Sequence, residues 1–354
     1  MESSTAKRQR FSIDLGGAGK DGLLADARAA EEAGFETVWA PELYRSAFVP
    51  LAAAAVQTSR LQLGTGIVLA FTRSPLITAL SALDLDELSE GRFVLGLGTG
   101  VKRLNEAWHN VANYGQPAPH MRETVEAVRL LMSKVHTGEP ISYKGEYFNL
   151  EIKGFQRPFK PYRPHIPIFM AGIQEKMVET AGQVADGLLG HPICSPLWIK
   201  QVILPNLESG LKKSGRERSA FTYSAGVTVS IAASDAPEAI AEARRAARST
   251  IAFYGTVKTY DPIWELHGYQ SQIAQIRRAF VKGDFPAMLD AVTDEMVEVF
   301  TIAGTVDYVR RRLAELNELC DVMWVGGPVY YLPLEQIAEY RKRVVELVGA
   351  INRG

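Results

Sequence analysis

The clearest structural signal in this chain lies in Arg60-Leu-Gln-Leu-Gly-Thr-Gly-Ile-Val-Leu-Ala-Phe-Thr-Arg-Ser-Pro75. Its apolar residues predict a buried strand over 61–68, interrupted near the carboxyl end by Gly64 and Gly66. A glycine inside a strand gives up packing and usually marks a bulge or the close approach of a ligand. Parallel α/β folds bind their ligands at the carboxyl ends of strands. Two interpretations remain open: the glycines serve a ligand, or the strand simply tolerates them.

Around this strand, short apolar runs alternate with longer segments of helical periodicity, which is typical of βαβ units and parallel strands. The pattern predicts strands at 11–14, 37–40, 61–68, 93–98, 168–171, 187–190, 223–231 and 321–325. Between and after them it predicts helices at 21–33, 50–57, 76–89, 122–136, 175–185, 196–213, 237–253, 306–319 and 334–351. Eight such alternations favour a closed (β/α)8 TIM barrel over an open doubly wound sheet.

Two longer segments interrupt the alternation. Residues of about 140–152 contain alternating apolar positions around a Lys-Gly turn and predict a hairpin. Residues of about 255–300 predict an irregular helical insertion. They belong to the insertions after the fourth and seventh strands, which we expect at the carboxyl-terminal face of the barrel, where such barrels build their sites. No linker separates them from the rest, and we expect residues 1–354 to form one domain.

The composition limits the possible partners. The chain carries 39 basic and 40 acidic residues, a formal net charge of −1, and therefore has no electrostatic footprint for nucleic acid or an anionic membrane. Its two cysteines, Cys194 and Cys320, are too few for a disulfide framework, which fits a reducing compartment. The amino terminus lacks an apolar signal region, and no run of about 18 apolar residues occurs. We expect a cytoplasmic enzyme with a small-molecule substrate.

Two glycine-containing loops are candidate ligand sites. Gly96-Leu-Gly-Thr-Gly100 has G-x-G-x-G spacing after the fourth strand, which differs from a dinucleotide-binding fingerprint and favours a flat ligand lying close to the backbone. The segment 168–177 passes from a buried strand directly into a helix. The unpaired amides of Gly172, Ile173 and Gln174 are then a candidate phosphate site, with Lys176 adding charge, although a simple strand-to-helix turn has the same pattern.

Titratable residues at predicted strand ends are candidate acids or bases. They are Glu42 after the second strand, His109 after the fourth and His191 after the sixth. A single histidine at a strand end is more often a hydrogen-bonded structural residue. Metal-ligand spacing and a G-x-S-x-G nucleophile elbow are both absent from the sequence. These absences favour chemistry that is supplied by an organic cofactor.

Four motifs resemble those of the bacterial luciferase-like superfamily, in the same order and over nearly the whole chain. They are Gly34-Phe-Glu-Thr-Val-Trp-Ala40, Leu63-Gly-Thr-Gly-Ile67, Leu88-Ser-Glu-Gly-Arg-Phe-Val-Leu-Gly-Leu-Gly-Thr-Gly100 and Ala181-Gly-Gln-Val-Ala-Asp-Gly187. Within this superfamily, Pro41-Glu42, Phe71-Thr-Arg-Ser-Pro75 and His191-Pro192 most resemble the oxidoreductases that use the deazaflavin coenzyme F420, such as methylenetetrahydromethanopterin reductase.

The resemblance implies a non-prolyl cis peptide at Gly66–Ile67, in a bulge that backs one face of the deazaflavin ring. It also implies cofactor contacts along the ring, the polyol chain and the phosphate. The implied residues are Glu42, Thr65, Gly66, Ile67, Thr99, Gly100, Asn105, Gly172, Ile173, Gln174 and Met177. Members usually form dimers through helices that flank strands two and three, and the alanine-rich stretch 51–56 permits such contact, as it would a buried helix within one subunit.

The sequence departs from the family at two positions. Leu43 occupies the place of a histidine that often follows strand two, and Val101 the place of a carboxylate after the strand-four glycines. Neither side chain can move a proton. The catalytic acid or base is therefore expected to be Glu42 or His191, or Asn105 acting through water, unless hydride transfer needs none.

These features predict an oxidoreductase that moves a hydride between coenzyme F420 and an unidentified organic substrate. The substrate would lie under the 255–300 insertion, where aromatic residues are available as walls: Tyr254, Tyr260, Trp264 and Tyr269. One alternative is an FMN-dependent monooxygenase of the same superfamily, since a phosphate loop serves either cofactor. A second alternative is a non-catalytic member that only binds flavin.

Overall fold

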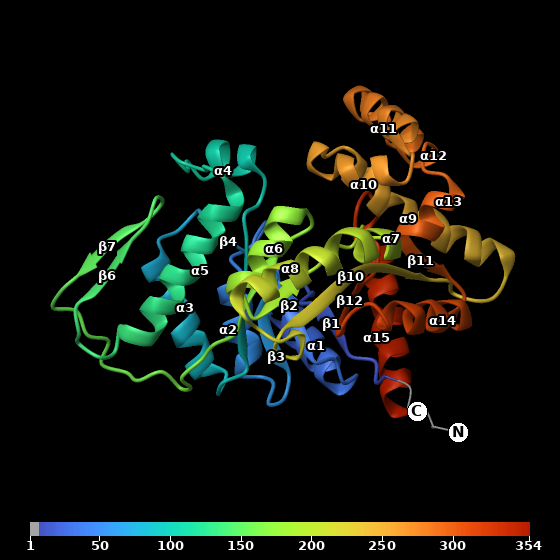
Figure 1. Cartoon of the computed structure of the whole chain (residues 1–354). Helices are drawn as coiled ribbons and strands as arrows, with labels where there is room; N and C mark the ends of the chain where they lie inside the picture. The colour runs from blue at the N-terminus through green and yellow to red at the C-terminus, as the bar shows by residue number, and fades with distance from the viewer. Residues whose placement is uncertain (1–6) are drawn as a thin grey trace, which may run out of the picture.

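The computed structural model describes residues 7–354 and contains a closed barrel of parallel strands, with helices covering its outside (Figure 1). The barrel strands in spatial order are β1 Phe11–Asp14, β2 Thr37–Ala40, β3 Gln62–Thr65 with its continuation β4 Val68–Leu69, β5 Phe93–Gly98, β8 Ile168–Ala171, β9 Gly187–Leu189, β10 Thr222–Ile231 and β12 Val322–Gly326. The circle closes where β12 pairs with β1, with Met323 beside Phe11. This confirms the predicted (β/α)8 barrel.

The covering helices follow the predicted segments, with shifted ends. They are α1 Gly19–Glu32, α2 Phe48–Ala55, α3 Pro75–Leu88, α5 Pro117–Lys134, α6 Glu175–Val184, α9 Pro237–Gly255, α14 Val306–Asn317 and α15 Leu334–Arg353. Helix α5 begins earlier than predicted because its prolines lie in the first turn, where a missing N–H costs nothing. The predicted helix 196–213 consists of α7 Pro196–Trp198, a π-helical turn at Ile199–Ile203 and α8 Leu204–Ser214.

The segment that follows α9 is more regular than the sequence suggested. It contains the turn η3 Lys258–Tyr260 and the helices α10 Asp261–Leu266, α11 Gln270–Lys282, α12 Phe285–Asp290 and α13 Asp294–Phe300. It ends in a strand that the sequence analysis missed, β11 Thr301–Gly304, which pairs in parallel with Thr228–Ile231 of β10. The pattern was missed because these four residues follow α13 without any turn signal. The insertion therefore returns to the barrel sheet before α14 begins.

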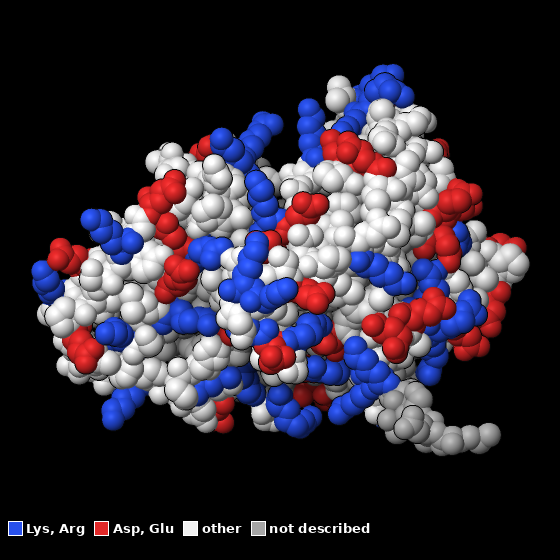
Figure 2. All heavy atoms as spheres, viewed as in Figure 1, with Lys and Arg blue, Asp and Glu red and all other residues white. Residues whose placement is uncertain are grey.

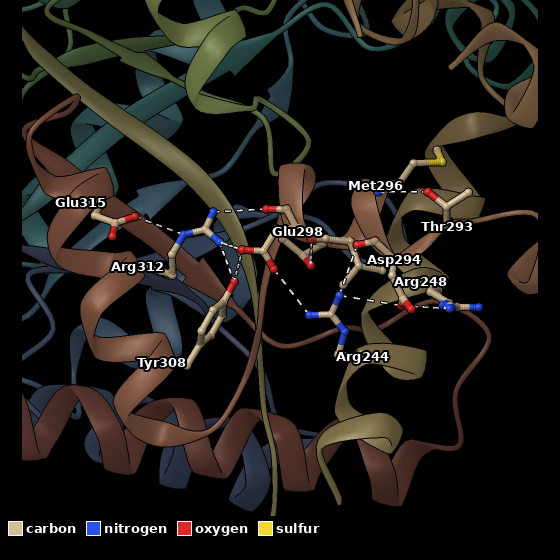
Figure 3. Close-up of polar contacts among 11 residues, drawn as sticks. Arg244, Arg248, Thr293, Asp294, Met296, Glu298, Tyr308, Arg312 and Glu315 are labelled. Atoms are coloured by element: carbon tan, nitrogen blue, oxygen red, sulfur yellow. Dashed lines mark hydrogen bonds and ion pairs between the residues drawn. The ribbon is translucent and has the colours of Figure 1, made fainter. Parts of the chain in front are cut away.

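A network of charged side chains ties this insertion to the barrel helices (Figure 3). Arg248 of α9 donates to the Asp294 carboxylate of α13 at 3.0 Å, and Arg244 lies 3.5 Å from Glu298. Arg312 of α14 completes the network by pairing with the same Glu298. Helices α9, α13 and α14 are thereby fixed relative to one another, which sets the place of the insertion above β10.

The remaining elements follow β5. They are α4 Lys102–Trp108 and a hairpin of β6 Ile141–Lys144 and β7 Asn149–Ile152. A short turn, η2 Arg218–Ala220, precedes β10. The hairpin is held on α5 by Glu123, whose carboxylate accepts the amides of Glu146 and Tyr147 at 2.8 Å each. Figure 1 shows the hairpin projecting to one side of the barrel, while α4 and α10–α12 rise at the same end as one another.

The packing inside the barrel explains the glycines in the strands. Three large rings fill it: Trp39 lies with its centroid 6.0 Å from Phe169 and 5.8 Å from Trp324. A Cβ atom on Gly64 would approach the Trp39 ring to 2.1 Å, and one on Gly187 would approach the Phe169 ring to 2.6 Å. The close approach at these glycines is therefore made by aromatic side chains of neighbouring strands, and the ligand interpretation of Gly64 is not needed.

The surface agrees with a balanced charge. Figure 2 shows basic and acidic side chains interspersed over the face that it presents. Among residues 7–354, no helix combines the length and the apolar character that a membrane span requires.

Candidate functional site

The strand-three break lies at the carboxyl-terminal mouth of the barrel. Residues 66 and 67 separate β3 from β4, and the Gly66–Ile67 peptide bond is cis, as the resemblance implied. The hydroxyl of Thr65 bridges the gap by donating to the Gly96 carbonyl at 2.8 Å and accepting from the Gly96 amide at 2.7 Å. The Thr65 side chain is fully buried, and both of these hydrogen bonds join it to β5. It holds the bulge and offers no free polar group to a ligand.

Ile67 presents its side chain to the mouth. A Cβ on Gly98 would come within 2.7 Å of that side chain, and Ala171 of β8 lies beside the same point. Ile67 packs with Trp39, Phe169 and Trp324 in a small apolar cluster separate from the main core. The glycine at 98 thus makes room for Ile67 rather than for a ligand. The bulge presents an apolar surface, with Ile67 half-buried at its top.

Glu42 is fixed from two sides. Arg73 donates to Oε2 at 2.7 Å and to Oε1 at 2.6 Å, and the Leu69 amide adds a third bond to Oε2 at 2.9 Å. Its own amide donates to the Ile67 carbonyl at 3.1 Å. Glu42 therefore connects the loop after β2 to both ends of β4. Such a clamped carboxylate suits the positioning of the bulge better than proton transfer.

The loop after β5 is held by Asn105 of α4. Its Nδ2 donates to the carbonyls of Thr99 at 2.7 Å and Val101 at 3.1 Å, while the Tyr114 hydroxyl donates to the Gly100 carbonyl at 2.9 Å. Gly100 has a φ of +60°, which favours glycine there. The Oδ1 atom of Asn105 is buried and accepts no hydrogen bond from the described residues. His109, in contrast, is exposed at the end of α4.

The loop between β8 and α6 matches the predicted phosphate site only in part. The Gly172 amide already donates to the Leu189 carbonyl at 3.3 Å, and the Ile173 carbonyl accepts from the Trp198 indole at 2.9 Å. The first main-chain hydrogen bond of α6 runs from the Val178 amide to the Gln174 carbonyl. Among the described residues, only the Gly172 amide of the three predicted amides has a main-chain acceptor, so the amides of Ile173 and Gln174 and of the first turn, residues 175–177, are left for an anion. Met177 packs against Gly172, and Lys176 is exposed.

Gln174 has a different role from its neighbours. Its side-chain amide donates to the Thr259 carbonyl in η3 at 2.8 Å. The insertion after β10 therefore contacts the loop after β8 directly. A second such bond joins Ser195, after β9, to His267 at 2.7 Å.

His191 lies after β9 among aromatic rings. Its ring centroid is 4.3 Å from that of Tyr254 and 4.6 Å from that of Tyr260. Burial lowers the pKa of His191 to about 3, so the ring is neutral at physiological pH. Nδ1 accepts from the Ile193 amide at 3.4 Å, which places the hydrogen of the neutral ring on Nε2. His191 is arranged as a hydrogen-bond donor and is a poor base.

Asp14 was missed by the sequence analysis, although it ends the first predicted strand. Its carboxylate lies 3.8 Å from the Cβ position of Gly326, at the end of the neighbouring strand β12. Burial raises the pKa of Asp14 to about 6, although Arg341 and Trp324 oppose the increase. An acidic residue at the carboxyl end of a barrel strand is a recognisable signal for catalysis. The raised pKa leaves a fraction of the Asp14 carboxyl group protonated near neutral pH.

Two tyrosine hydroxyls complete the mouth. Tyr254 of α9 and Tyr330, in the loop after β12, share a hydrogen bond of 2.8 Å, and Phe253 stacks on Tyr330 at 3.7 Å. Burial raises the pKa of both hydroxyls, and the Asp14 charge adds to each increase. The other aromatic residues proposed as walls differ. Trp264 is buried and packs against Phe300, and the partly buried ring of Tyr269 packs against the same phenylalanine. Both rings therefore belong to the interior of the insertion.

Two cavities of the described residues lie away from Asp14 and Ile67. One of about 360 Å³ lies at the opposite, amino-terminal end of the barrel and is lined by Arg10, Glu36 and Arg163, among others. Another of about 410 Å³ lies between α5 and α6 beside Arg122 and Lys176. No group of three or more metal-ligating side chains occurs within residues 7–354.

Comparison with known proteins gives consistent relatives. The model of the family described as luciferase-like monooxygenase matches residues 3–321. An uncharacterized protein of Mycobacterium tuberculosis is 39% identical over 293 residues, covering 80% of this chain and 84% of its own length. The 5,10-methylenetetrahydromethanopterin reductase of Archaeoglobus fulgidus is 31% identical over 338 residues, covering 91% of this chain and 92% of the relative.

A solved structure agrees with these sequence matches. The coenzyme F420-dependent tetrahydromethanopterin reductase of Methanopyrus kandleri superposes with a TM-score of 0.80 at 28% identity, covering 97% of each chain. The similarity extends over the barrel and its insertions alike.

Proposed function

The chain belongs to the luciferase-like monooxygenase family, and from this premise we propose that it is an oxidoreductase that transfers a hydride between coenzyme F420 and an organic substrate. The Archaeoglobus relative is named as a 5,10-methylenetetrahydromethanopterin reductase, and the solved structure as a coenzyme F420-dependent tetrahydromethanopterin reductase. The observation that carries the proposal is that one barrel mouth contains both the apolar bulge at Ile67 and a carboxyl group, Asp14, with a pKa near 6.

The residues of the mouth fit such a cofactor. Ile67 would provide an apolar surface for one face of a flat ring, and the backbone of Gly66, Thr99 and Gly100 would contact the cofactor in this proposal. The buried Oδ1 of Asn105 has no donor among the described residues, and a hydroxyl of the polyol chain would supply one. The first-turn amides of α6, beside Met177, would hold the phosphate.

A reduced deazaflavin bound here would supply a hydride to an electrophilic carbon of the substrate. If that carbon is double-bonded to a heteroatom, the electron pair of the double bond would pass to the heteroatom, which would then need a proton. Asp14 is the proton donor in this proposal, because its raised pKa leaves a useful fraction of the acid near neutral pH. In the reverse direction the Asp14 carboxylate accepts that proton.

His191 and Glu42 have supporting roles. The Nε2 hydrogen of neutral His191 would donate to the substrate heteroatom and orient it, between Tyr254 and Tyr260. Glu42 acts through Arg73 and Leu69 and keeps the bulge in place. Neither residue needs to change its protonation state during the reaction.

An FMN-dependent monooxygenase is the second candidate, and the family description supports it. The first-turn amides of α6 would accept the phosphate of either cofactor. A member that binds a flavin without catalysis is the third candidate.

We also propose that the enzyme is a cytoplasmic homodimer that acts on a small-molecule substrate. The thiols of Cys194 and Cys320, both buried and free, suit a reducing compartment.

The test is a titration of the purified protein with F420 and, separately, with FMN, followed by ring fluorescence. We expect micromolar or tighter binding of F420 and much weaker binding of FMN. A preference for FMN, with oxygen consumption on reduction, would replace the proposal by the monooxygenase. If the protein binds neither F420 nor FMN, both the hydride-transfer function and the monooxygenase function are excluded. The variant Asp14→Asn should bind F420 like the parent and lose turnover, whereas Asp21→Asn, exposed in α1, should retain both.

A further inference from the structure

The main chain at Asp14 is fixed by residues from distant parts of the chain. Arg341 of α15 donates from Nη2 to the Asp14 carbonyl at 2.6 Å. The same guanidinium donates two hydrogen bonds to the Asp26 carboxylate of α1, from Nε to Oδ1 at 2.5 Å and from Nη2 to Oδ2 at 2.6 Å. Asp26 in turn accepts the Gly16 amide at 2.8 Å. The main chain that leaves β1 is therefore fixed at residue 14 by Arg341 and at residue 16 by Asp26.

This arrangement is specific to an arginine. One planar group spans a carbonyl and both oxygens of a carboxylate, which the single ammonium of a lysine cannot do in the same way. The side chains of Arg341 and Asp26 are 20% and 14% exposed, so water contributes little to their contacts. Gly16 leaves the space for the guanidinium, since a Cβ there would lie 2.9 Å from Nε.

The pair also determines the charge around Asp14. The positive charge of Arg341 lowers the pKa of Asp14 and the negative charge of Asp26 raises it, against the larger increase caused by burial. The other groups that face Asp14 are Trp324 of β12, Tyr254 of α9 and Tyr330 of the loop after β12. These three side chains are neutral at physiological pH, so the Arg341–Asp26 pair supplies the fixed charges that act on Asp14.

We propose that Arg341 and Asp26 are positioning residues: they fix the main chain at residues 14 and 16, and in this way they place the Asp14 carboxyl group in the barrel mouth close to their own charges. Neither residue touches a substrate or a cofactor in this proposal. The inference rests on the proposed function for its catalytic meaning, but the titration of Asp14 is measured without cofactor, substrate or turnover.

The experiment is a pH titration by NMR of the full chain labelled with ¹³C at its aspartate carboxyl groups. The Asp14 signal is assigned by its loss in Asp14→Asn. We expect a midpoint of about 6 in the parent. Arg341→Met removes the positive charge and leaves Asp26, so the midpoint should rise by about one pH unit; Asp26→Asn should lower it by a similar amount.

Two variants separate charge from position. Arg341→Lys keeps the charge but loses the bridge, so the midpoint should stay near that of the parent while kcat falls about tenfold or more. The control is Arg10→Met, which removes a comparable ion pair, with Glu36, at the opposite end of the same strand and should leave the Asp14 midpoint unchanged. Should Arg341→Met fail to fold, Asp26→Asn and Arg341→Lys still decide the question.

An Asp14 midpoint that stays the same in folded Arg341→Met and Asp26→Asn would overturn the inference. The proposed function is tested separately, by the turnover of Asp14→Asn. If Asp14→Asn retains full turnover while the midpoints shift as expected, the catalytic role fails and the electrostatic role stands.

Discussion

The guanidinium of Arg73 holds both carboxylate oxygens of Glu42, at 2.6 and 2.7 Å, across the strand-three bulge. The residues are 31 positions apart, and their side chains are 23% and 12% exposed. Leu69 of β4 donates to the same carboxylate. The pair thus connects the loop after β2 to the segment that carries Ile67, and it determines where the apolar surface of the bulge lies.

Glu42→Gln should weaken cofactor binding and leave the pH dependence of turnover unchanged. The amide keeps the shape but loses the charge that Arg73 requires, and a charged hydrogen bond contributes about 1.5–3 kcal/mol, or roughly ten- to hundredfold in Kd. Isothermal titration with F420 measures the loss. Glu36→Gln is the matched control, because Glu36 forms the same kind of pair with Arg10 before β2. If Glu42→Gln changes the pH profile and not the Kd, Glu42 is itself the acid.

The pH dependence should have opposite signs in the two reaction directions. Asp14 is protonated below a pH of about 6, so the kcat/KM of substrate reduction should fall about tenfold per unit as the pH rises above that value. The reverse oxidation needs the carboxylate and should rise with pH to a plateau. Steady-state rates between pH 5 and 8 would be measured in both directions. A profile without this inflection, with hydride transfer shown to be rate-limiting, would exclude Asp14 as the acid.

Gly64→Ala should destabilise the barrel through overpacking. The new methyl group would meet the Trp39 ring at 2.1 Å, with no flexible side-chain end that can move away. Overpacking of this kind costs about 1–3 kcal/mol, which thermal and urea unfolding would show. The double variant Gly64→Ala with Trp39→Phe has more room and should recover part of the loss. If Gly64→Ala leaves stability unchanged, the packing explanation of this glycine is wrong.

Local periodicity was sufficient to predict the barrel from sequence. Strand 11–14 and strand 168–171 were predicted at their observed bounds because each is an apolar run next to a clear helix or turn signal. The four-residue β11 has no such boundary and was missed. Site residues that depend on local sequence, such as Ile67 at the bulge, could also be recognised from a family motif.

Features that depend on distant contacts could not be predicted in the same way. The partner of Gly64 is Trp39, on the neighbouring strand, and only the register of β2 and β3 brings the two together. Asp14 is an ordinary surface-like residue in the sequence, and its burial and its neighbour Arg341, 327 positions away, appear only in the closed barrel. The two hydrogen bonds of the Thr65 hydroxyl to Gly96 likewise depend on a residue 31 positions away.

His191 should contribute to catalysis without titrating. Its pKa of about 3 keeps the ring neutral throughout the working range, so His191→Ala should lower kcat/KM at every pH above 5 by a similar factor, about ten- to hundredfold for one lost hydrogen-bond donor. Rates for His191→Ala, His191→Asn and Tyr254→Phe would be compared from pH 5 to 8. The asparagine keeps a donor and should recover part of the activity. A loss confined to low or to high pH would instead identify a titrating histidine.

A homodimer joining α2 and α3 of each subunit is expected from the apolar side chains that these helices leave exposed. Val49 is 71% exposed and Ile77 is 52% exposed, on helices that flank strands two and three. A glutamate at either position would be buried without a partner in such an interface, at a cost of several kcal/mol. Sedimentation equilibrium should therefore give a dimer for the parent and a monomer for Val49→Glu with Ile77→Glu. Val281→Glu, at a site 86% exposed on α11, should remain dimeric. A monomeric parent, or a double variant that stays dimeric, would contradict this interface.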